Sequence, residues 1–582
     1  MFKNLVVILV VLVSTTFVVV GQPVVSSAVN GASYLTPPNP SATVNGIPPI
    51  AQGSIFVVFG TGMGPAALVQ ATSFPLQTTL SGTSISVTSG GQTVSPYMVY
   101  TLAGQLAAIL PSTTPVGTAT LTVTYNNQTS KSITINVTKA VPGIFTINSQ
   151  GTGPGVAQVA LSSTNIKLNN LTTPGTPGSV MILYGTGLGP ISGPDNVPPG
   201  AVSTGGTVTV TIGGTAATVL YAGRAPQFPG EDQINIQLPA NVPLGCYTPA
   251  EITVNGVPSN DFVLSTATAG STSCVHPFGL SQSAEATVDA GGSVNAGVFA
   301  AVRGAVPPIT AEGTGGLFGN FNGSELYNAY TQILANFHVV YYPVPAGTSG
   351  SCVVYDELSG ASKGANIPTD FTIVGGTELY PAPSSLALDF LTLSGPNGIT
   401  QNITRAGSGG PGAGYLWVSI TPSVLGEGAY TLSGPGGPDI AAFSATTQFP
   451  QNLVWTQLGS LNNPIAANGV TLAWTGNGTA AQPNVNIFGS ASVFNNSDPS
   501  QNRGKSFSCI VPAGSGSSTF AVPSSITSQL PVASAGETAE GSLGISIGGG
   551  SQFNATLMSG KALDGTFFGF GEAFVNSPVT WH

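Results

Sequence analysis

The chain carries very little charge. Only 5% of its 582 residues are Asp, Glu, Lys or Arg, with 11 basic against 21 acidic side chains. A nucleic-acid-binding surface needs clustered cations that displace counterions from phosphates, and so few scattered cations cannot form one. The formal charge of -10 is modest for this length, and the acidic residues occur singly or in pairs. Nucleic acid is therefore excluded as a partner, and solubility must come from Ser, Thr, Asn and Gln.

Cysteine is also scarce. The four cysteines are Cys246, Cys274, Cys352 and Cys509. No Cys-x-x-Cys pair or neighbouring His pair accompanies them, which argues against a metal site. Their number fits disulfides in an oxidising compartment and allows three pairings. Neighbour order would join Cys246 to Cys274 and Cys352 to Cys509, and on the chain-entropy model each bridge would stabilise the fold by about 3 to 5 kcal/mol.

A long apolar run occurs only at the N-terminus. Lys3 precedes the run Leu5–Val20, which is interrupted by one Ser and two Thr. Its length is short for a bilayer span, which needs about 20 residues, so a signal peptide over residues 1–21 is favoured over a retained anchor. No later segment approaches a span. We expect a secreted or cell-surface protein without an integral membrane span after cleavage.

The most informative feature that is present is an internal repeat. Residues 53–65 read GSIFVVFGTGMGP, and residues 178–190, 125 positions later, read GSVMILYGTGLGP. Each copy runs from β-branched and aromatic residues into glycines, as a buried strand does before a turn with positive φ. The glycines expected to serve as structural turns are Gly60, Gly62, Gly64, Gly185, Gly187 and Gly189. A repeat at domain-sized spacing predicts tandem modules.

The two copies share further landmarks in the same order. QLAAILP at 105–111 corresponds to QINIQLP at 233–239, and alternating strands close both copies. The main length difference is an insertion at Ala225–Glu231, which belongs in a loop because a strand cannot absorb it without changing its buried face. Short alternating strands with Gly and Pro turns in about 110 to 125 residues favour an immunoglobulin-like β-sandwich over a barrel.

The motifs also resemble those of a known family. AVNGASY at 28–34, VPGIF at 141–145, LYAG at 220–223 and DQINIQLP at 232–239, with the two GTGxGP turns, resemble the tandem modules of secreted acidobacterial proteins of the Solibacter type. These modules are similar to IPT/TIG immunoglobulin-like domains. The resemblance covers roughly 28–265 and implies an extracytoplasmic array of β-sandwiches, with modules at 22–140 and 141–268. It implies no catalytic residues.

The remainder of the chain has a different character. Residues 269–350 form a connecting region of mixed character, with helical patterns at 284–302 and, more weakly, at 324–337. Residues 351–582 return to β patterns. LTLSGPNG at 391–398 and YTLSGPGG at 430–437 repeat one strand-and-turn unit. The overall expectation is an all-β chain, in which tandem Ig-like sandwiches precede one or two C-terminal β-rich sandwich domains.

Motifs that suggest nucleotide or hydrolase chemistry lack the surroundings that such chemistry needs. Pro65 and Pro190 follow the GTGxG turns where a dinucleotide loop requires a helix N-terminus, so we expect no cofactor. Ser362 lies in the letters of a nucleophile elbow, but in a polar loop. His276, His338 and His582 are the only histidines available for a triad. Asp498, Ser500 and Asn502 resemble the start of a calcium loop, but Arg503 replaces the turn glycine and an Asx-rich turn is favoured.

Glycoside hydrolysis requires two facing carboxyl groups. The candidates are Glu231, Asp232, Asp356, Glu357, Asp389, Glu427 and Asp439. We expect these to be exposed loop acids, with Glu231 and Asp232 closing a loop by a hydrogen bond. Aromatic side chains that could stack on sugars if exposed, but are expected in cores, are Trp417, Trp455, Trp474 and Phe567–Phe570.

Three functions remain open. The favoured one is a secreted or cell-surface non-enzymatic protein whose β-modules act as spacer and as adhesion or ligand-binding scaffold. The second is a carbohydrate-active enzyme or carbohydrate-binding protein with an active C-terminal domain. The third is a self-assembling fibre or sheath subunit, since low charge and strand edges allow edge-to-edge joining. The expected partners are surface glycans, other surface proteins or copies of the chain itself, and no catalytic or metal residue is assigned.

Overall fold

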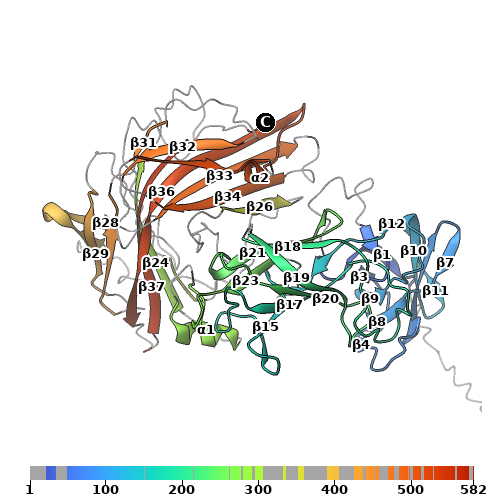
Figure 1. Ribbon diagram of the computed structural model, residues 1–582. Helices are drawn as coiled ribbons and strands as arrows, with labels where there is room; N and C mark the ends of the chain where they lie inside the picture. The colour runs from blue at the N-terminus through green and yellow to red at the C-terminus, as the bar shows by residue number, and fades with distance from the viewer. Residues whose placement is uncertain are drawn as a thin grey trace, which may run out of the picture.

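The computed structural model describes residues 21–34, then 49–305 with short gaps such as 277–279 and 291–294, and much of 390–582. Between these parts it describes only the strands at 332–335 and 352–359. The signal-peptide prediction, Ser362, His338, Asp389, Asp439, Asp498 and Trp417 lie outside the described residues. Figure 1 shows the described chain as two N-terminal β-modules followed by a larger β-rich region.

Module 1, residues 22–140, is a sandwich of two sheets, ordered β1-β3-β9-β8-β4 and β2-β12-β10-β6-β5. The strands are β1 (Val24–Asn30), β2 (Pro49–Ala51), β3 (Ile55–Thr61), β4 (Val69–Gln70), β5 (Thr79–Leu80), β6 (Thr83–Ser89), β7 (Gln92–Val94), β8 (Tyr97–Leu102), β9 (Gln105–Ile109), β10 (Gly117–Tyr125), β11 (Gln128–Thr129) and β12 (Ile133–Thr138). Alternate apolar residues such as Phe56, Val58, Ile85 and Leu121 fill the space between the sheets. This inward alternation is what a sandwich core requires.

Module 2, residues 141–268, keeps the main strand pairings of module 1, but its strands form one 11-stranded sheet because β19 pairs with both β18 and β20. Its elements are β13 (Gly143–Ile144), β14 (Gly153–Pro154), β15 (Ala157–Ala160), β16 (Ile166–Leu168), β17 (Val180–Thr186), β18 (Val208–Ile212), β19 (Thr215–Arg224), β20 (Asp232–Gln237), β21 (Gly245–Val254), β22 (Val257–Pro258) and β23 (Phe262–Thr266). β17 pairs with β20 and β13 as β3 pairs with β9 and β1. β14 runs parallel to β23 as β2 runs parallel to β12. The two GTGxGP segments therefore hold equivalent positions in one fold.

The glycines of these segments are tied to that fold by their surroundings. A Cβ on Gly60 would lie 2.0 Å from the carbonyl oxygen of Val24, and one on Gly185 would lie 2.2 Å from that of Gly143. Gly62 and Gly187 have φ of +65° and +97°. The first pair allows the edge strand to approach closely, and the second pair turns the chain.

Hydroxyl side chains, rather than charges, cover the outer face of one module 1 sheet. Thr134, Thr120, Thr88 and Thr93 are register partners across β12, β10, β6 and β7, and all four are exposed. The hydroxyls of Thr88 and Thr93 are 2.9 Å apart. Threonine suits both strand geometry and solvent. This row explains how a chain with so little charge presents a polar surface.

The C-terminal region is built on one long sheet, ordered β25-β24-β37-β36-β33-β34-β26, with two smaller sheets packed against it. The large sheet contains β24 (Asn295–Ala305), β25 (Gln332–Ala335), β26 (Cys352–Ser359), β33 (Asn484–Asn495), β34 (Arg503–Pro512), β36 (Glu537–Thr556) and β37 (Ala562–Val575). The small sheets contain β27 (Phe390–Ser394), β28 (Thr400–Thr404), β29 (Gly428–Gly434) and β30 (Phe443–Phe449), and β31 (Val454–Trp455), β32 (Val470–Thr475) and β35 (Ser517–Val522). The SGPNG unit begins at the last residue of β27, and the SGPGG unit begins near the end of β29. These two strands are neighbours in one sheet.

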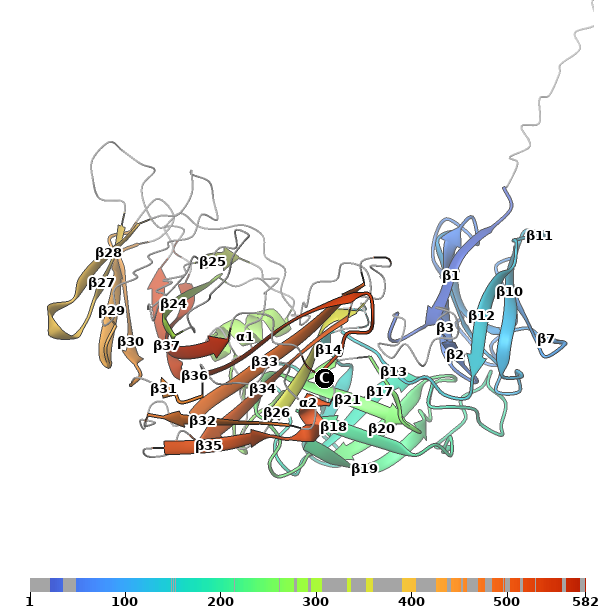
Figure 2. The same ribbon diagram turned by 90° about the horizontal axis from the view of Figure 1, so that it is seen from above.

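Two hydrophobic cores share the long hairpin β36–β37. Leu543 and Ile545 of β36 pack in the core beneath β32, whereas Phe553 of the same strand packs with Tyr430 and Phe449 beneath β29 and β30. The pairing of β36 with β37 is continuous in register, so these odd-numbered residues lie on one face. In Figure 2 the four-stranded sheet lies at the end of the molecule away from module 1.

The helix expectations in the connecting region are wrong in part. Helix α1 spans Gln282–Asp289, and the chain then forms strand β24 instead of continuing as a helix to 302. Gln332–Ala335, inside the second expected helix, is strand β25. Both strands enter the large sheet, because pairing of β24 with β37 and of β25 with β24 outweighs the local helical pattern. The short helices α2 (Ser524–Thr527) and η2 (Pro396–Gly398) complete the fold.

Candidate functional site: the junction between the modules

The insertion that distinguishes module 2 lies against module 1. It forms the loop between β19 and β20, as its length predicts. A Cβ on Gly230 of this loop would meet side-chain atoms of Ile109 and Ile55 at 2.8 and 3.0 Å, and the ring of Phe228 packs edge-on to that of Phe74 at 5.7 Å. The loop thus covers one end of the module 1 sheet.

One buried ion pair joins the two ends of this loop. Arg224 ends β19, Asp232 begins β20, and their side chains form a salt bridge with both fully buried. The second guanidinium nitrogen donates to the carbonyl oxygen of Gly53 in module 1 at 2.7 Å and to that of Gly189 at 2.8 Å. One arginine therefore joins the two modules, the GTGLGP turn and β20.

Asp232 also closes the turn that precedes it in module 2. Its Oδ2 accepts a hydrogen bond from the backbone amide of Leu188 at 2.7 Å, which confirms the predicted loop-closing bond. The expectation of an exposed loop acid is wrong for Asp232, because it begins β20 and its side chain is fully buried. Burial raises the pKa of Asp232, and Arg224 together with the amides of Leu188 and Gly187 opposes that rise. A carboxylate engaged in this way is a structural group, not a free acid.

A second carboxylate crosses the junction. Asp195 accepts hydrogen bonds from the backbone amide and the hydroxyl of Ser112 in module 1, at 2.6 and 2.7 Å. Burial raises the pKa of Asp195, while Ser112 and Arg224 act in the opposite direction.

A Cβ on Gly53 would lie 2.2 Å from the Arg224 guanidinium, so only glycine fits there.

The sequence motifs meet at the same place. Asn30 of AVNGASY accepts hydrogen bonds from the amides of Ala32 and Ser33 and donates to the carbonyl oxygen of Val141 in VPGIF at 2.9 Å. Thr186 of the second GTGLGP turn accepts from the amide of Ile55 at 2.8 Å and donates to Gly230 at 2.7 Å. In module 1 the equivalent Thr61 is exposed. The motifs therefore build a module junction.

Glu231 is the titratable group at the edge of this junction. It is partly exposed, and burial, with the neighbouring Asp232 charge, raises its pKa to about 7. Tyr184 lies close enough that Glu231 helps to raise the tyrosine's pKa. Glu231 is thus not a simple exposed loop acid.

A second junction holds module 2 to the following region. The disulfide Cys246–Cys274 ties β21 to the segment before α1, and it is one of the two bridges that neighbour order indicates. Asp289 at the end of α1 accepts from the amides of Leu171 and Thr172 at 3.1 and 2.8 Å. Ser281, the N-cap of α1, hydrogen-bonds to Asp564 of β37. The helix therefore links module 2 to the large C-terminal sheet, as Figure 1 also shows.

The titratable side chains around this disulfide are buried, and burial shifts their pKa values toward the neutral form. His276 is buried with its Nε2 3.1 Å from the hydroxyl of Tyr247, and burial lowers its pKa to about 3. Glu285 is buried beside the disulfide, and desolvation raises its pKa to about 7. Because both sulfurs are in the disulfide, they are not metal ligands. Cys509 is also disulfide-bonded, and its register partner on β26 is Cys352.

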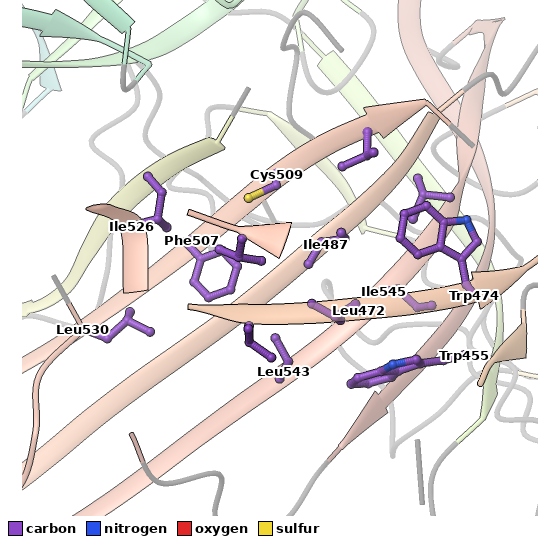
Figure 3. Close-up of a cluster of buried hydrophobic side chains, with 14 of the residues drawn as sticks. Trp455, Leu472, Trp474, Ile487, Phe507, Cys509, Ile526, Leu530, Leu543 and Ile545 are labelled. Carbon is purple, nitrogen blue, oxygen red and sulfur yellow. The ribbon is translucent and has the colours of Figure 1, made fainter. Parts of the chain in front are cut away.

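The described aromatic candidates for sugar stacking are core residues. Trp455 and Trp474 are 3% and 1% exposed and pack with Leu472, Ile487 and Ile545 in the core shown in Figure 3. Phe567 is buried in the second C-terminal core. Of the carboxylate candidates, Glu427 is exposed at the start of β29, and Asp356 and Glu357 lie on β26. Glu427 therefore lies beside a different sheet from Asp356 and Glu357, and all three are far from Asp232 in the sequence.

Sequence reasoning missed three members of the junction, Arg224, Asp195 and Ser112. The usable signal was Arg224, one of only four arginines, placed directly after the LYAG motif in a chain almost without charge. A cation at the end of a repeat strand, eight residues before an aspartate, points to an ion pair across the intervening loop. Nothing local singles out Ser112 or Asp195, because their contact spans 83 residues.

Comparison with known proteins finds only weak structural similarities. No family model matches the chain, and no curated protein matches it. A tetra-tandem repeat from the extending region of a large adhesion protein is similar over 95% of this chain and 99% of its own, with 13% identity and a TM-score of 0.13. Sidekick-1 immunoglobulin domains 1–5 cover 91% of this chain and 78% of theirs, with 10% identity and a TM-score of 0.12. A Bacteroides ovatus glucan-utilization protein, SGBP-B, covers 85% and 91%, with 10% identity and a TM-score of 0.13.

These similarities are too low to carry any argument about activity. With the sheet topology above, the chain is an all-β protein of tandem immunoglobulin-like modules followed by a β-rich region. Among the described residues, no helix is long and apolar enough to cross a membrane.

Proposed function

We propose that this protein is a secreted or cell-surface, non-enzymatic scaffold, in which a rigid array of β-modules acts as a spacer and presents surfaces for adhesion or ligand binding. The observation that carries the proposal is the buried junction in which Arg224 holds Asp232 and the carbonyl oxygen of Gly53. Contacts between domains of one chain are often loose and polar, which permits relative motion. A buried ion pair whose arginine also bonds to the other module fixes the angle between modules instead.

Other features support the same reading. The second junction, with a disulfide and a helix bound at both ends, extends the rigid connection toward the C-terminal sheet. Disulfides persist in oxidising compartments outside the cytosol. The polar hydroxyl surface and low charge suit a protein that stays soluble without attracting ions or nucleic acid.

The test is a distance measurement along the intact mature chain. Spin labels would be attached at Thr93→Cys on β7 and Thr446→Cys on β30, two exposed threonines near opposite ends of the molecule. A rigid spacer gives one narrow distance distribution by pulsed electron resonance. A broad distribution, or turnover of a polysaccharide by the purified chain, would contradict the proposal.

A further inference from the structure

The outer face of the β1-β3-β9-β8-β4 sheet in module 1 is divided by module 2. On this face lie Ile55, Val57 and Phe59 of β3, because Phe56 and Val58 point into the sandwich core. The end that carries Ile55 and Ile109 is covered by the 225–231 loop. Within the described residues the 225–231 loop does not cover the end that carries Phe59, whose side chain is partly exposed and packs in a cluster with Phe145 of module 2.

Partly exposed aromatic rings gather at that end. The ring of Tyr34 lies 6.3 Å from the ring of Phe59, and Tyr100 of β8 is also partly exposed. Gln105, the register partner of Phe59, donates from its Nε2 to the hydroxyl of Tyr100 at 2.6 Å. We call Tyr34, Phe59, Tyr100 and Gln105 the aromatic face.

Tyr34 is held in place by the module junction. Its φ is +53°, which a bulky side chain adopts only where the surroundings enforce it. Its amide donates to the carbonyl oxygen of Asn30 at 3.1 Å, and the Asn30 side chain is the one that reaches Val141 of module 2. The aromatic face is therefore continuous with the junction, and the hydrogen bonds of Asn30 hold Tyr34 in a fixed position.

Module 1 itself contributes almost no charge to this face. Residues 22–140 contain no Asp, Glu, Arg or His, and their two cations are Lys131 and Lys139. Both lysines flank β12, in the opposite sheet of the sandwich. Burial, followed by the nearby Tyr34, raises the pKa of Tyr100 to about 12, so its hydroxyl stays neutral. Module 1 therefore offers no charged side chain on this face to pair with a charged ligand.

We propose that the aromatic face binds a neutral polysaccharide. The rings of Tyr34, Phe59 and Tyr100 offer flat apolar surface for the C–H faces of sugar rings, and Gln105 with the tyrosine hydroxyls offers donors and acceptors for sugar hydroxyls. A charged polymer would gain nothing here, and a protein partner would require a much larger apolar core. The proposal deepens the ligand-binding part of the proposed function and rests on it.

The test uses the full mature chain with its disulfides intact. Binding of neutral soluble β-glucan, galactomannan and dextran would be measured by affinity electrophoresis and calorimetry, with anionic polygalacturonate for comparison. We expect at least one neutral polymer to bind and polygalacturonate not to bind. Phe59→Ala and Tyr100→Ala should each weaken binding by about fivefold or more, the equivalent of roughly 1 kcal/mol for an aromatic contact.

The matched control is Tyr125→Ala, a partly exposed tyrosine on β10 of the opposite sheet, which should bind as the parent does. If the alanine variants unfold, Tyr100→Phe combined with Gln105→Leu removes the polar groups and should still weaken binding. Absence of binding to every neutral polymer, equal binding by all variants, or preference for polygalacturonate would overturn the inference. The spin-label distances are independent of these outcomes, so failure here leaves the scaffold proposal standing.

Discussion

Replacing Arg224 by Met is the sharpest test of how the modules are held together. The change removes a buried cation and leaves the carboxylate of Asp232 without its charge partner. It also removes the donors to the carbonyl oxygens of Gly53 and Gly189. Breaking one half of a buried ion pair costs about 3 to 5 kcal/mol, because the remaining charge stays desolvated.

Scanning calorimetry of the full mature chain would measure this loss. For a domain between 100 and 150 residues, each kcal/mol shifts the unfolding midpoint by about 3 to 5 °C, so the module transition should fall by roughly 10 °C or more. The transitions that arise from the C-terminal region should stay where they are. Distance distributions across the junction should broaden at the same time, because Arg224 is a direct bond between the modules.

The double variant Arg224→Met with Asp232→Leu separates two causes of instability, the unpaired buried charge of Asp232 and the lost hydrogen bonds of Arg224. With both charges replaced by apolar groups, no buried charge is left alone, and most of the midpoint should return. The module angle should remain broadened, since the bond to Gly53 is still absent. A single variant that loses less than about 1 kcal/mol, or a double variant worse than the single, would refute this account of the junction.

Three further outcomes can be measured on the same chain. Gly187→Ala should destabilise by more than about 2 kcal/mol, because its Cβ would lie 2.0 Å from the Val141 carbonyl oxygen, whereas Gly62→Ala, with open space around it, should cost only the roughly 1 kcal/mol of left-handed strain. Replacing both Cys246 and Cys274 by Ala should cost about 3 to 4 kcal/mol, as the bridge closes a loop with a sequence separation of 28, and equal chemical stability would count against it. Glu285, whose folded pKa of about 7 lies above its ordinary value, binds more protons when folded, so its contribution to stability should fall as pH rises from about 5 to 8. Glu285→Gln should remove that contribution, so the stability difference between parent and variant should change by about 1 to 3 kcal/mol between pH 5 and 8, measured as unfolding midpoints of both chains against pH.

Much of the fold was accessible from local patterns. The alternation of β-branched and polar residues indicated β10, β20, β32 and β36, and the glycine-tipped repeat placed β3 and β17 at equivalent positions. These predictions succeed because strand alternation and turn conformation depend on residues within a few positions of one another. The expected helix at 324–337 fails over Gln332–Ala335, where pairing with the distant β24 decides the backbone.

The site was accessible only in part. The motif residues Asn30, Thr186 and Asp232 stood out in the sequence, but as family landmarks and not as contacts with a partner module. The partly exposed aromatic face does not stand out in the sequence either, and tryptophans such as Trp474, the usual stacking candidates, are core residues. Exposure of an aromatic ring is set by packing from other strands, which composition does not record.

The sequence by itself determined that this protein repeats one sandwich, where its turns fall, and that its surface must be polar without being charged. Only the tertiary structure decided that the insertion in module 2 packs against module 1, and that Arg224 reaches the carbonyl oxygen of Gly53, 171 residues away. The physical reason is one of range. Backbone conformation and strand faces are written over a few neighbouring residues, whereas an ion pair across two modules exists only after both have folded and met.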